Sequence, residues 1–251
     1  MPIKILIIPG HDDEVWGAQY GNTKEADMNL GVATELFNIL KKDKRFEVHV
    51  TREKGGYTQE FADYFSLRKD EVLAFKEATK AGRQNQIING SFVQKDNNPH
   101  LNVSEDIALR LYGFNKWANE NKMDAMIHIH FNDYPRKNNW IIGKYKGFVI
   151  YMPEEQMSNA RESSRLAANI FLELKKKYIT STFEKEKGGL VPDQTLIALG
   201  VNNTLLSSVR SILIEYGYIY RFKNNTTRKQ AYKNMAKFTA AGIKDYFKDG
   251  P

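Results

Sequence analysis

The sequence predicts an α/β fold in which helices cover both faces of a mostly parallel, twisted sheet. Apolar runs of strand length alternate along the chain with segments of helical periodicity. These runs contain few polar positions, which is typical of strands buried on both faces of a parallel sheet. The chain has no internal repeat and no low-complexity linker, so we expect one domain over residues 1–251.

The first three elements form a predicted β-α-β unit. Residues 3–8 are a β-branched apolar strand that Pro9 and Gly10 end, and residues 46–51 alternate as a second strand. Between them, residues 25–41 are expected to form a helix, because apolar side chains recur at helical spacing. This order favours a parallel pair of strands. The apolar positions of the helix are Leu30, Ala33, Leu36, Phe37 and Leu40.

Residues 55–103 interrupt the alternation and are expected to be a helical insertion. Gly55-Gly56 marks a loop, residues 60–83 are polar but helix-forming, and residues 97–99 form a turn. We expect one or two helices that lie on the domain without a core of their own. The insertion has three open interpretations: a lid over the functional cleft, a surface that binds a partner, or padding.

The second half of the chain supplies the remaining strands and helices. Ser104 is expected to cap the first of these helices, Gly217 to end the last strand, and Thr226 or Thr227 to cap the terminal helix. The predicted elements are a helix from residue 104 carrying Ile107, Leu111, Phe114 and Trp117, strands at 125–130, 147–151 and 211–216, helices at 159–177 and 194–199, and a helix ending at Phe247.

Composition narrows the chemistry that the chain can perform. With 41% hydrophobic and 27% charged residues, it resembles an ordinary soluble globular protein. It has no cysteine, so a transition metal must be held by His, Asp or Glu. No apolar run reaches the ~20 residues of a membrane span, and Met1-Pro2 leads into the first strand without a signal-peptide pattern, which leaves the export route open. The histidines are His11, His49, His100, His128 and His130.

The formal net charge of +7 is compatible with an anionic partner such as nucleic acid, acidic polysaccharide or a membrane surface. The lysines at 41–42, at 175–177 and at 185 and 187 are scattered along the chain. We therefore favour a solvated basic surface and expect no nucleic-acid partner.

Four residues that carry chemistry are expected at one edge of the sheet. His11, His130 and Glu215 lie at or near the carboxyl ends of predicted strands, and Glu25 begins the helix after the first strand. In open α/β sheets ligands bind at this edge. Two imidazoles and a carboxylate are the ligands of many hydrolytic zinc sites, which keep one position for water and lower its pKa toward ~7. A further carboxylate would serve as general base. Glu215 suits that role because it lies on a buried strand and Gly217, two residues later, allows the backbone to pass close to a substrate.

Five segments in order resemble the zinc-dependent N-acetylmuramoyl-L-alanine amidases of bacterial cell walls, the type-3 amidase family. The resemblance extends over the whole chain apart from the insertion. The segments are Ile7-Ile8-Pro9-Gly10-His11, Lys24-Glu25-x-x-x-Asn29-Leu30, Val50-Thr51-Arg52, Asp124-Ala125-Met126-Ile127-His128-Ile129-His130-Phe131-Asn132, and Ile214-Glu215-Tyr216-Gly217-Tyr218.

This resemblance implies a catalytic domain that holds Zn²⁺ through His11, Glu25 and His130 and uses Glu215 as the catalytic glutamate. It implies cleavage of the amide between the lactyl group of N-acetylmuramic acid and the L-alanine of the peptide stem. Peptidoglycan would be the partner, and the protein would act at the cell wall, in the periplasm or outside the cell. A host autolysin and a phage endolysin fit the sequence equally, and no activating protein is indicated.

The chain departs from the family pattern beside the predicted ligands. His128 stands where the family usually has serine, Phe131 replaces a small residue, and Asp12-Asp13 replaces the usual glycine. His128 shares a strand face with His130, so it is a candidate to contact the metal or the substrate, or even to be the ligand itself. A packed core histidine is the equal alternative.

Two asparagines are further candidates. Asn29 lies one helical turn after Glu25 and is placed to orient it, while Asn132 is placed to hold substrate. Ordinary capping or turn roles are the alternative for both. His49 is expected to be structural, and His100 to be a solvated loop residue.

Two other functions compete with the amidase. A zinc metallopeptidase would use the same ligands on a bond within the stem or in another peptide. A non-catalytic module that binds cell wall or nucleic acid would keep the fold, and the altered Gly-His-Asp-Asp segment and the net charge support it.

Overall fold

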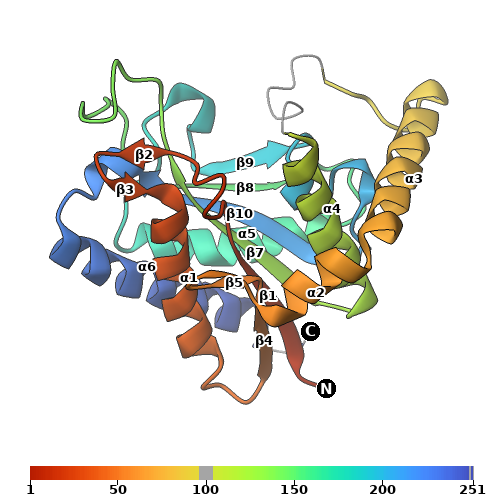
Figure 1. The fold of residues 1–251 in the computed structure, drawn as a ribbon, viewed down its shortest axis with the longest axis horizontal. Coiled ribbons are helices and arrows are strands. Elements are labelled where there is room, and N and C mark those ends of the chain that lie inside the picture. The colour runs from red at the N-terminus through yellow and green to blue at the C-terminus, as the bar shows by residue number, and fades with distance from the viewer. Residues whose placement is uncertain (96–103, 249, 251) are drawn as a thin grey trace.

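A six-stranded sheet forms the centre of the computed structural model, which describes residues 1–95, 104–248 and 250 (Figure 1). The strand order is β4-β1-β7-β10-β8-β9. The first four strands run parallel, whereas β8 is antiparallel to β10 and pairs in parallel with β9. The predicted α/β fold with a mostly parallel sheet is confirmed. The bounds are Phe46–Val50 for β4, Ile3–Pro9 for β1, Ala125–Asn132 for β7, Arg210–Tyr218 for β10, Val149–Pro153 for β8 and Leu190–Asp193 for β9.

Helices cover both faces of this sheet (Figure 1). Helices α1, α5 and α6 pack on one face, α2 and α4 pack on the other, and α3 packs against α4. Alternation along β1 explains the two layers, because Ile5 and Ile7 join the α1 side while Leu6 and Ile8 join the α4 side. The bounds are Glu25–Leu40 for α1, Gln59–Leu67 for α2, Lys69–Ile88 for α3, Glu105–Glu120 for α4, Ala160–Lys175 for α5 and Asn225–Tyr246 for α6.

Two short hairpins and several 3₁₀ turns lie outside the central sheet. Hairpin β2–β3 precedes α1, and hairpin β5–β6 precedes α2. Single turns of 3₁₀ helix occupy the loops of the second half, so the predicted helix at 194–199 is only one such turn. The bounds are Gln19–Tyr20 for β2, Thr23–Lys24 for β3, Arg52–Glu53 for β5, Gly56–Tyr57 for β6, Glu184–Glu186 for η2, Ile197–Leu199 for η3, Val201–Asn203 for η4 and Ile219–Arg221 for η5.

The last strand does not end at Gly217, contrary to the prediction. Strand β10 continues to Tyr218, and its register with β7 shifts between Glu215 and Tyr218. Gly217 has a φ of +147°, a conformation that side chains rarely adopt, so the glycine allows the irregularity within the strand.

The cap of the terminal helix was also predicted wrongly. Asn224 is the N-cap of α6, and its Oδ1 accepts hydrogen bonds from the backbone N–H groups of Thr226 (2.9 Å) and Thr227 (3.2 Å). Asparagine is a strong N-cap residue because it satisfies the free donors of the first turn. The two threonines therefore supply these donors.

The insertion contributes two helices, within the predicted one or two, and they complete one face of the sheet. Phe61 of α2 is fully buried, with ring centroids 4.8 Å from Trp117 and 5.7 Å from Phe114 of α4. Val72 of α3 is buried in a neighbouring cluster with Tyr112. The insertion is therefore packed into the core. His100 and the predicted turn at 97–99 lie outside the described residues.

We expect Phe61→Ala to lower the free energy of unfolding by about 3–5 kcal/mol, because it removes a buried aromatic ring and leaves a cavity. Urea denaturation of the two proteins measures this difference. Leu67→Ala is the control, because Leu67 lies on the same helix and is 79% exposed. Equal stability of the Phe61 variant and the parent would contradict a structural role for α2.

Among the helices of the described part of the chain, none combines the length and the hydropathy that a membrane crossing requires.

Candidate metal centre

The four residues predicted at the carboxyl edge lie where the central strands end. His11 follows β1 with a φ of +62°, and Glu25 is the first residue of α1. His130 on β7 and Glu215 on β10 are direct neighbours across the sheet. One ligand atom from each of His11, Glu25 and His130 lies within 4.8 Å of the others.

Each oxygen of the Glu25 carboxylate faces one imidazole. His11 Nε2 lies 3.2 Å from Glu25 Oε2, and His130 Nδ1 lies 3.1 Å from Glu25 Oε1. The two imidazole rings meet edge to face, with centroids 5.1 Å apart. This arrangement offers two nitrogen donors and one carboxylate to a single point, the donor set of a catalytic zinc site.

Backbone and side-chain donors hold the Glu25 carboxylate in place. Oε2 accepts from the backbone N–H of Ala18 (2.8 Å), and Oε1 accepts from that of Phe131 (3.2 Å). Burial alone raises the pKa of Glu25, but hydrogen bonds to His11 and His130 outweigh it and hold the pKa well below its usual range. The group therefore stays an anion at neutral pH.

Asn29 makes the contacts that an orienting residue requires. Its Nδ2 donates to Glu25 Oε1 at 3.3 Å and to the backbone oxygen of Gly10 at 2.9 Å. It thus ties the helix that carries one predicted ligand to the loop before another. The orienting role remains a prediction that this geometry supports.

Two glycines let the backbone wrap closely around the three side chains. A Cβ atom on Gly10 would lie 2.1–2.7 Å from ring atoms of His130, and one on Gly17 would lie 2.4 Å from Glu25 Oε2. No side chain fits at such distances, so the sequence keeps these positions free for the imidazoles and the carboxylate. With this donor set and this space, the residues fit a zinc ion.

We expect Gly10→Ala to abolish zinc binding, because its methyl group must displace the His130 ring. Metal analysis of the purified variant measures this loss. Gly82→Ala in α3 is the matched control, since a Cβ there meets no atom within 4 Å. Full zinc content in the Gly10 variant would show that the three side chains do not form the metal site.

Glu215 lines the same edge without joining the three ligands. Its Oε2 is buried and has no hydrogen-bond partner among the described residues. Burial, together with repulsion from the Glu25 and Glu186 carboxylates, raises the pKa of Glu215 well above its usual value. A carboxyl group with a raised pKa accepts a proton more readily near neutral pH.

A family of known proteins matches most of the chain. The family model of N-acetylmuramoyl-L-alanine amidases matches residues 5–245. The chain belongs to this family. A comparison with curated proteins finds no match.

Solved structures similar to the amidase share its fold at low sequence identity. An N-acetylmuramoyl-L-alanine amidase from Clostridium difficile 630 is 17% identical with a TM-score of 0.61, covering 100% of this chain and 99% of that one. The CwlD amidase from Clostridioides difficile, in complex with the GerS lipoprotein, is 18% identical with a TM-score of 0.64, covering 98% and 99%. The catalytic domain of the CD27L endolysin, which targets Clostridia difficile, is 16% identical with a TM-score of 0.51, covering 97% of both chains.

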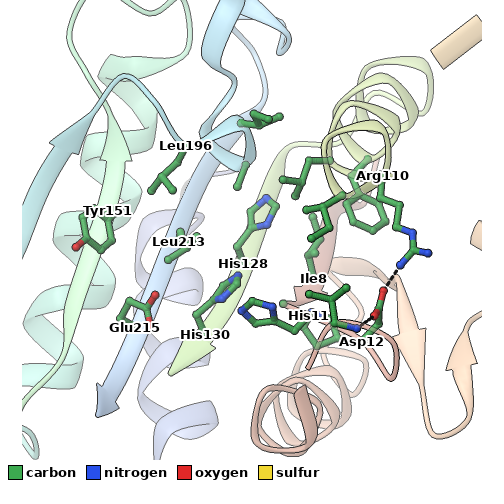
Figure 2. Close-up of a pocket in the computed structure, with 18 of the residues that line it drawn as sticks. Ile8, His11, Asp12, Arg110, His128, His130, Tyr151, Leu196, Leu213 and Glu215 are labelled. Carbon is green, nitrogen blue, oxygen red and sulfur yellow. Dashed lines mark hydrogen bonds and ion pairs between the residues drawn. The ribbon is translucent and has the colours of Figure 1, made fainter. Parts of the chain in front are cut away.

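A cavity of about 330 Å³ extends from His11 and His130 beneath α4 and η3 (Figure 2). Its floor is one row of neighbouring residues on the sheet, namely Ile8, His128, Leu213 and Tyr151. His130 and Glu215 belong to the next row and lie at one end of the cavity. Of the insertion's described residues, Tyr57 alone lines this space.

His128 lies in the floor of this cavity and not among the three clustered ligands. It is only 1% exposed, and its Nε2 has no hydrogen-bond partner among the described residues. Burial and the neighbouring His130 imidazole lower the pKa of His128 to about 3, so the ring is neutral. The structure thus buries it as a core histidine would be buried, but leaves one nitrogen unsatisfied.

Asp12, which stands where the family usually has glycine, fixes the loop after His11. Its Oδ1 accepts from the backbone N–H of Val15 at 2.8 Å, and its Oδ2 accepts from Tyr57 at 3.1 Å. It also forms an ion pair with Arg110 of α4 (Figure 2). The loop that carries His11 is therefore attached to both the insertion and the cavity wall.

Glu186 is a buried carboxylate that the sequence analysis missed. It accepts hydrogen bonds from Asn132 Nδ2 (2.7 Å), Tyr151 (3.0 Å) and Tyr218 (2.9 Å). Asn132 lines the cavity as a substrate-holding residue would, but its amide N–H group is engaged by Glu186. Glu186 lies between two lysines in a polar stretch, so no local signal marked it as buried.

His49 lies outside the metal centre. Its ring packs against Trp117 with centroids 5.3 Å apart and contacts the carboxylates of Glu47 and Glu60. These contacts agree with the expected structural role.

Proposed function

We propose that the protein is a zinc hydrolase that cleaves the amide between N-acetylmuramic acid and L-alanine in peptidoglycan. The observation that carries the proposal is the convergence of His11, Glu25 and His130 beside Glu215 on the adjacent strand, whose buried Oε2 has no hydrogen-bond partner among the described residues. The family match supports the substrate class. Residues 1–251 would form one catalytic domain that acts at the cell wall, in the periplasm or outside the cell.

The residues of the site divide the work of hydrolysis. His11, Glu25 and His130 would hold the ion. A bound Zn²⁺ polarises a carbonyl oxygen and lowers the pKa of a water molecule toward ~7. Glu215 takes the proton that water loses as its oxygen attacks the amide carbon, and then delivers it to the leaving nitrogen as the C–N bond breaks. The products are the lactyl carboxylate and the free amine of L-alanine.

Burial suits Glu215 to this proton transfer. Its raised pKa makes the carboxylate a stronger base than a solvated glutamate, and its position beside His130 places it next to the ligands. The cavity lined by His128 and Leu213 adjoins the same carboxyl group and would receive the substrate on one side of the scissile bond.

Digestion of purified sacculi tests the proposal. We expect mass spectrometry of the soluble products to show stem peptides with free N-terminal L-alanine and glycan strands with an intact lactyl carboxylate. New termini within the stem would instead identify a metallopeptidase. A zinc-loaded protein that binds sacculi and releases neither product would be a non-catalytic module.

A further inference from the structure

Three segments at the carboxyl edge of the sheet carry a concentrated positive charge. They contain nine Lys or Arg residues and no Asp or Glu, although acidic residues make up 30 of the 251 in the chain. We call these segments, residues 16–24, 134–147 and 219–229, the basic rim. The three segments are far apart in the sequence, but folding brings them together.

Hydrogen bonds join the segments of the basic rim into one surface. The loop after β7 lies beside the β2–β3 hairpin (Figure 1), where the N–H of Gly21 donates to the oxygen of Asn139. The third segment contacts both of the others. The side-chain bonds are Arg136 to the oxygen of Gln19 (2.8 Å), Arg221 to the oxygen of Gly143 (3.0 Å) and Arg228 to Thr23 Oγ1 (2.9 Å).

The basic rim is directly connected to the metal centre. Ala18 of the first segment donates its backbone N–H to Glu25, and the backbone oxygen of Trp16 accepts from Ala26. Lys24 is the residue immediately before Glu25. The first segment of the rim is therefore held directly against the helix that carries the predicted ligand Glu25.

Aromatic rings, and not carboxylates, lie next to two of the ammonium groups of the rim. Lys24 Nζ lies 4.3 Å from the ring centroid of Trp16, and Lys144 Nζ lies 4.7 Å from that of Tyr145. Within the described residues, the ion pair of the rim is that of Arg136 with Asp133. The remaining charges are left to attract an anion from solution.

The rim also exposes apolar surface beside these charges. Trp140 is 67% exposed, and Ile141 and Ile142 next to it are 41% and 44% exposed. The indole is held against the hairpin, because a Cβ on Gly21 would lie 2.8 Å from its Cζ3. An exposed indole that contacts the hairpin and lies near lysines suits a ligand that has both apolar ring faces and carboxylates.

We propose that the basic rim is the docking surface for the carboxylate-bearing glycan-peptide strand that presents the scissile amide. This inference rests on the proposed function, because it identifies the polymer as peptidoglycan. The charge of the rim is complementary to the stem carboxylates, and Trp140 would stack on a sugar ring. The contact with Glu25 favours this strand over an anionic membrane, because a membrane on the rim would lie beside the metal centre without supplying a bond to cleave.

The test measures binding without hydrolysis. All proteins carry Glu215→Gln, and co-sedimentation with purified sacculi is measured at several salt concentrations. The rim variant is Lys137→Gln, Lys144→Gln and Lys223→Gln. The control is Lys42→Gln, Lys54→Gln and Lys177→Gln, three exposed lysines elsewhere whose replacement changes the net charge equally. Thermal unfolding verifies that both variants fold.

We expect the rim variant to bind sacculi at least about tenfold more weakly and with less dependence on salt, while the control stays within about twofold of the parent. Sacculi whose carboxylates have been amidated should lose binding to the parent by a similar factor. Equal loss in both variants would reduce the effect to net charge and overturn the proposal. The proposal would also be overturned if the rim substitutions weakened binding to phosphatidylglycerol vesicles but left binding to sacculi unchanged. Failure of the proposed hydrolysis is separate, since it appears as intact sacculi with the wild-type protein.

Discussion

Glu215→Gln is expected to lower turnover of peptidoglycan about 10³-fold while the zinc content remains that of the parent. Glutamine has the shape of glutamate but cannot take a proton from water, and general acid–base catalysis contributes about 10²–10⁴-fold. The side chain lies next to His130 but outside the cluster of His11, Glu25 and His130, so its replacement leaves all three donors in place.

Parallel assays on one preparation separate the two parts of this prediction. Release of L-alanine N-termini from sacculi measures turnover, and elemental analysis measures zinc per chain. Glu184→Gln is the control, because this carboxylate lies in η2 and is exposed. Loss of zinc together with turnover would make Glu215 a ligand, whereas retained turnover would remove it from the mechanism.

The cluster of His11, Glu25 and His130 could be predicted from the sequence because each of these residues follows a local signal. Pro9-Gly10 ends an apolar strand directly before His11, and Glu25 opens an amphipathic segment. Parallel strands place their carboxyl ends at one edge, so topology alone brings such residues together. The periodicity of apolar residues in β1 and α1 likewise predicts which side chains face each side of the sheet.

The surroundings of the centre depend on contacts that have no local signal. Asp12 pairs with Arg110 across 98 residues, and Asn132 bonds Glu186 across 54 residues. Arg110 lies in an apolar helical segment and Glu186 in a polar loop, and nothing near either residue in the sequence indicates its distant partner. Only the packing of α4 and η2 against the sheet brings these partners together. A single sequence therefore indicates the ligands better than the side chains that hold them.

The edge of the sheet was harder to predict for a similar reason. Strand β9 is only four residues long, contains Pro192 and follows two glycines, a pattern that predicts a loop. It becomes a strand because β8 offers it a parallel partner. The basic rim is a further case, since its charge is distributed over three distant segments and is concentrated only by folding.

His11→Ala is expected to reduce zinc from about one ion per chain to a level near zero, with complete loss of turnover. It removes one of three protein donors, and a site with two donors no longer matches the three protein ligands of catalytic zinc. In the folded protein His11 Nε2 lies 3.2 Å from Glu25 Oε2, so the variant also leaves a buried carboxylate with one fewer partner. Elemental analysis after dialysis against zinc measures the first effect.

Thermal unfolding adds a readout that does not depend on activity. An ion that binds only the folded state raises its stability, so a chelator should lower the Tm of the parent and leave that of His11→Ala unchanged. His49→Ala is the matched control, because His49 lies on β4 and contacts Trp117 and two carboxylates outside the metal centre.

His128→Gln tests whether His130 or His128 is the zinc ligand on β7. Retained zinc in that variant agrees with His130 as the ligand, whereas loss of zinc in it and retention in His130→Ala would move the site two residues along β7.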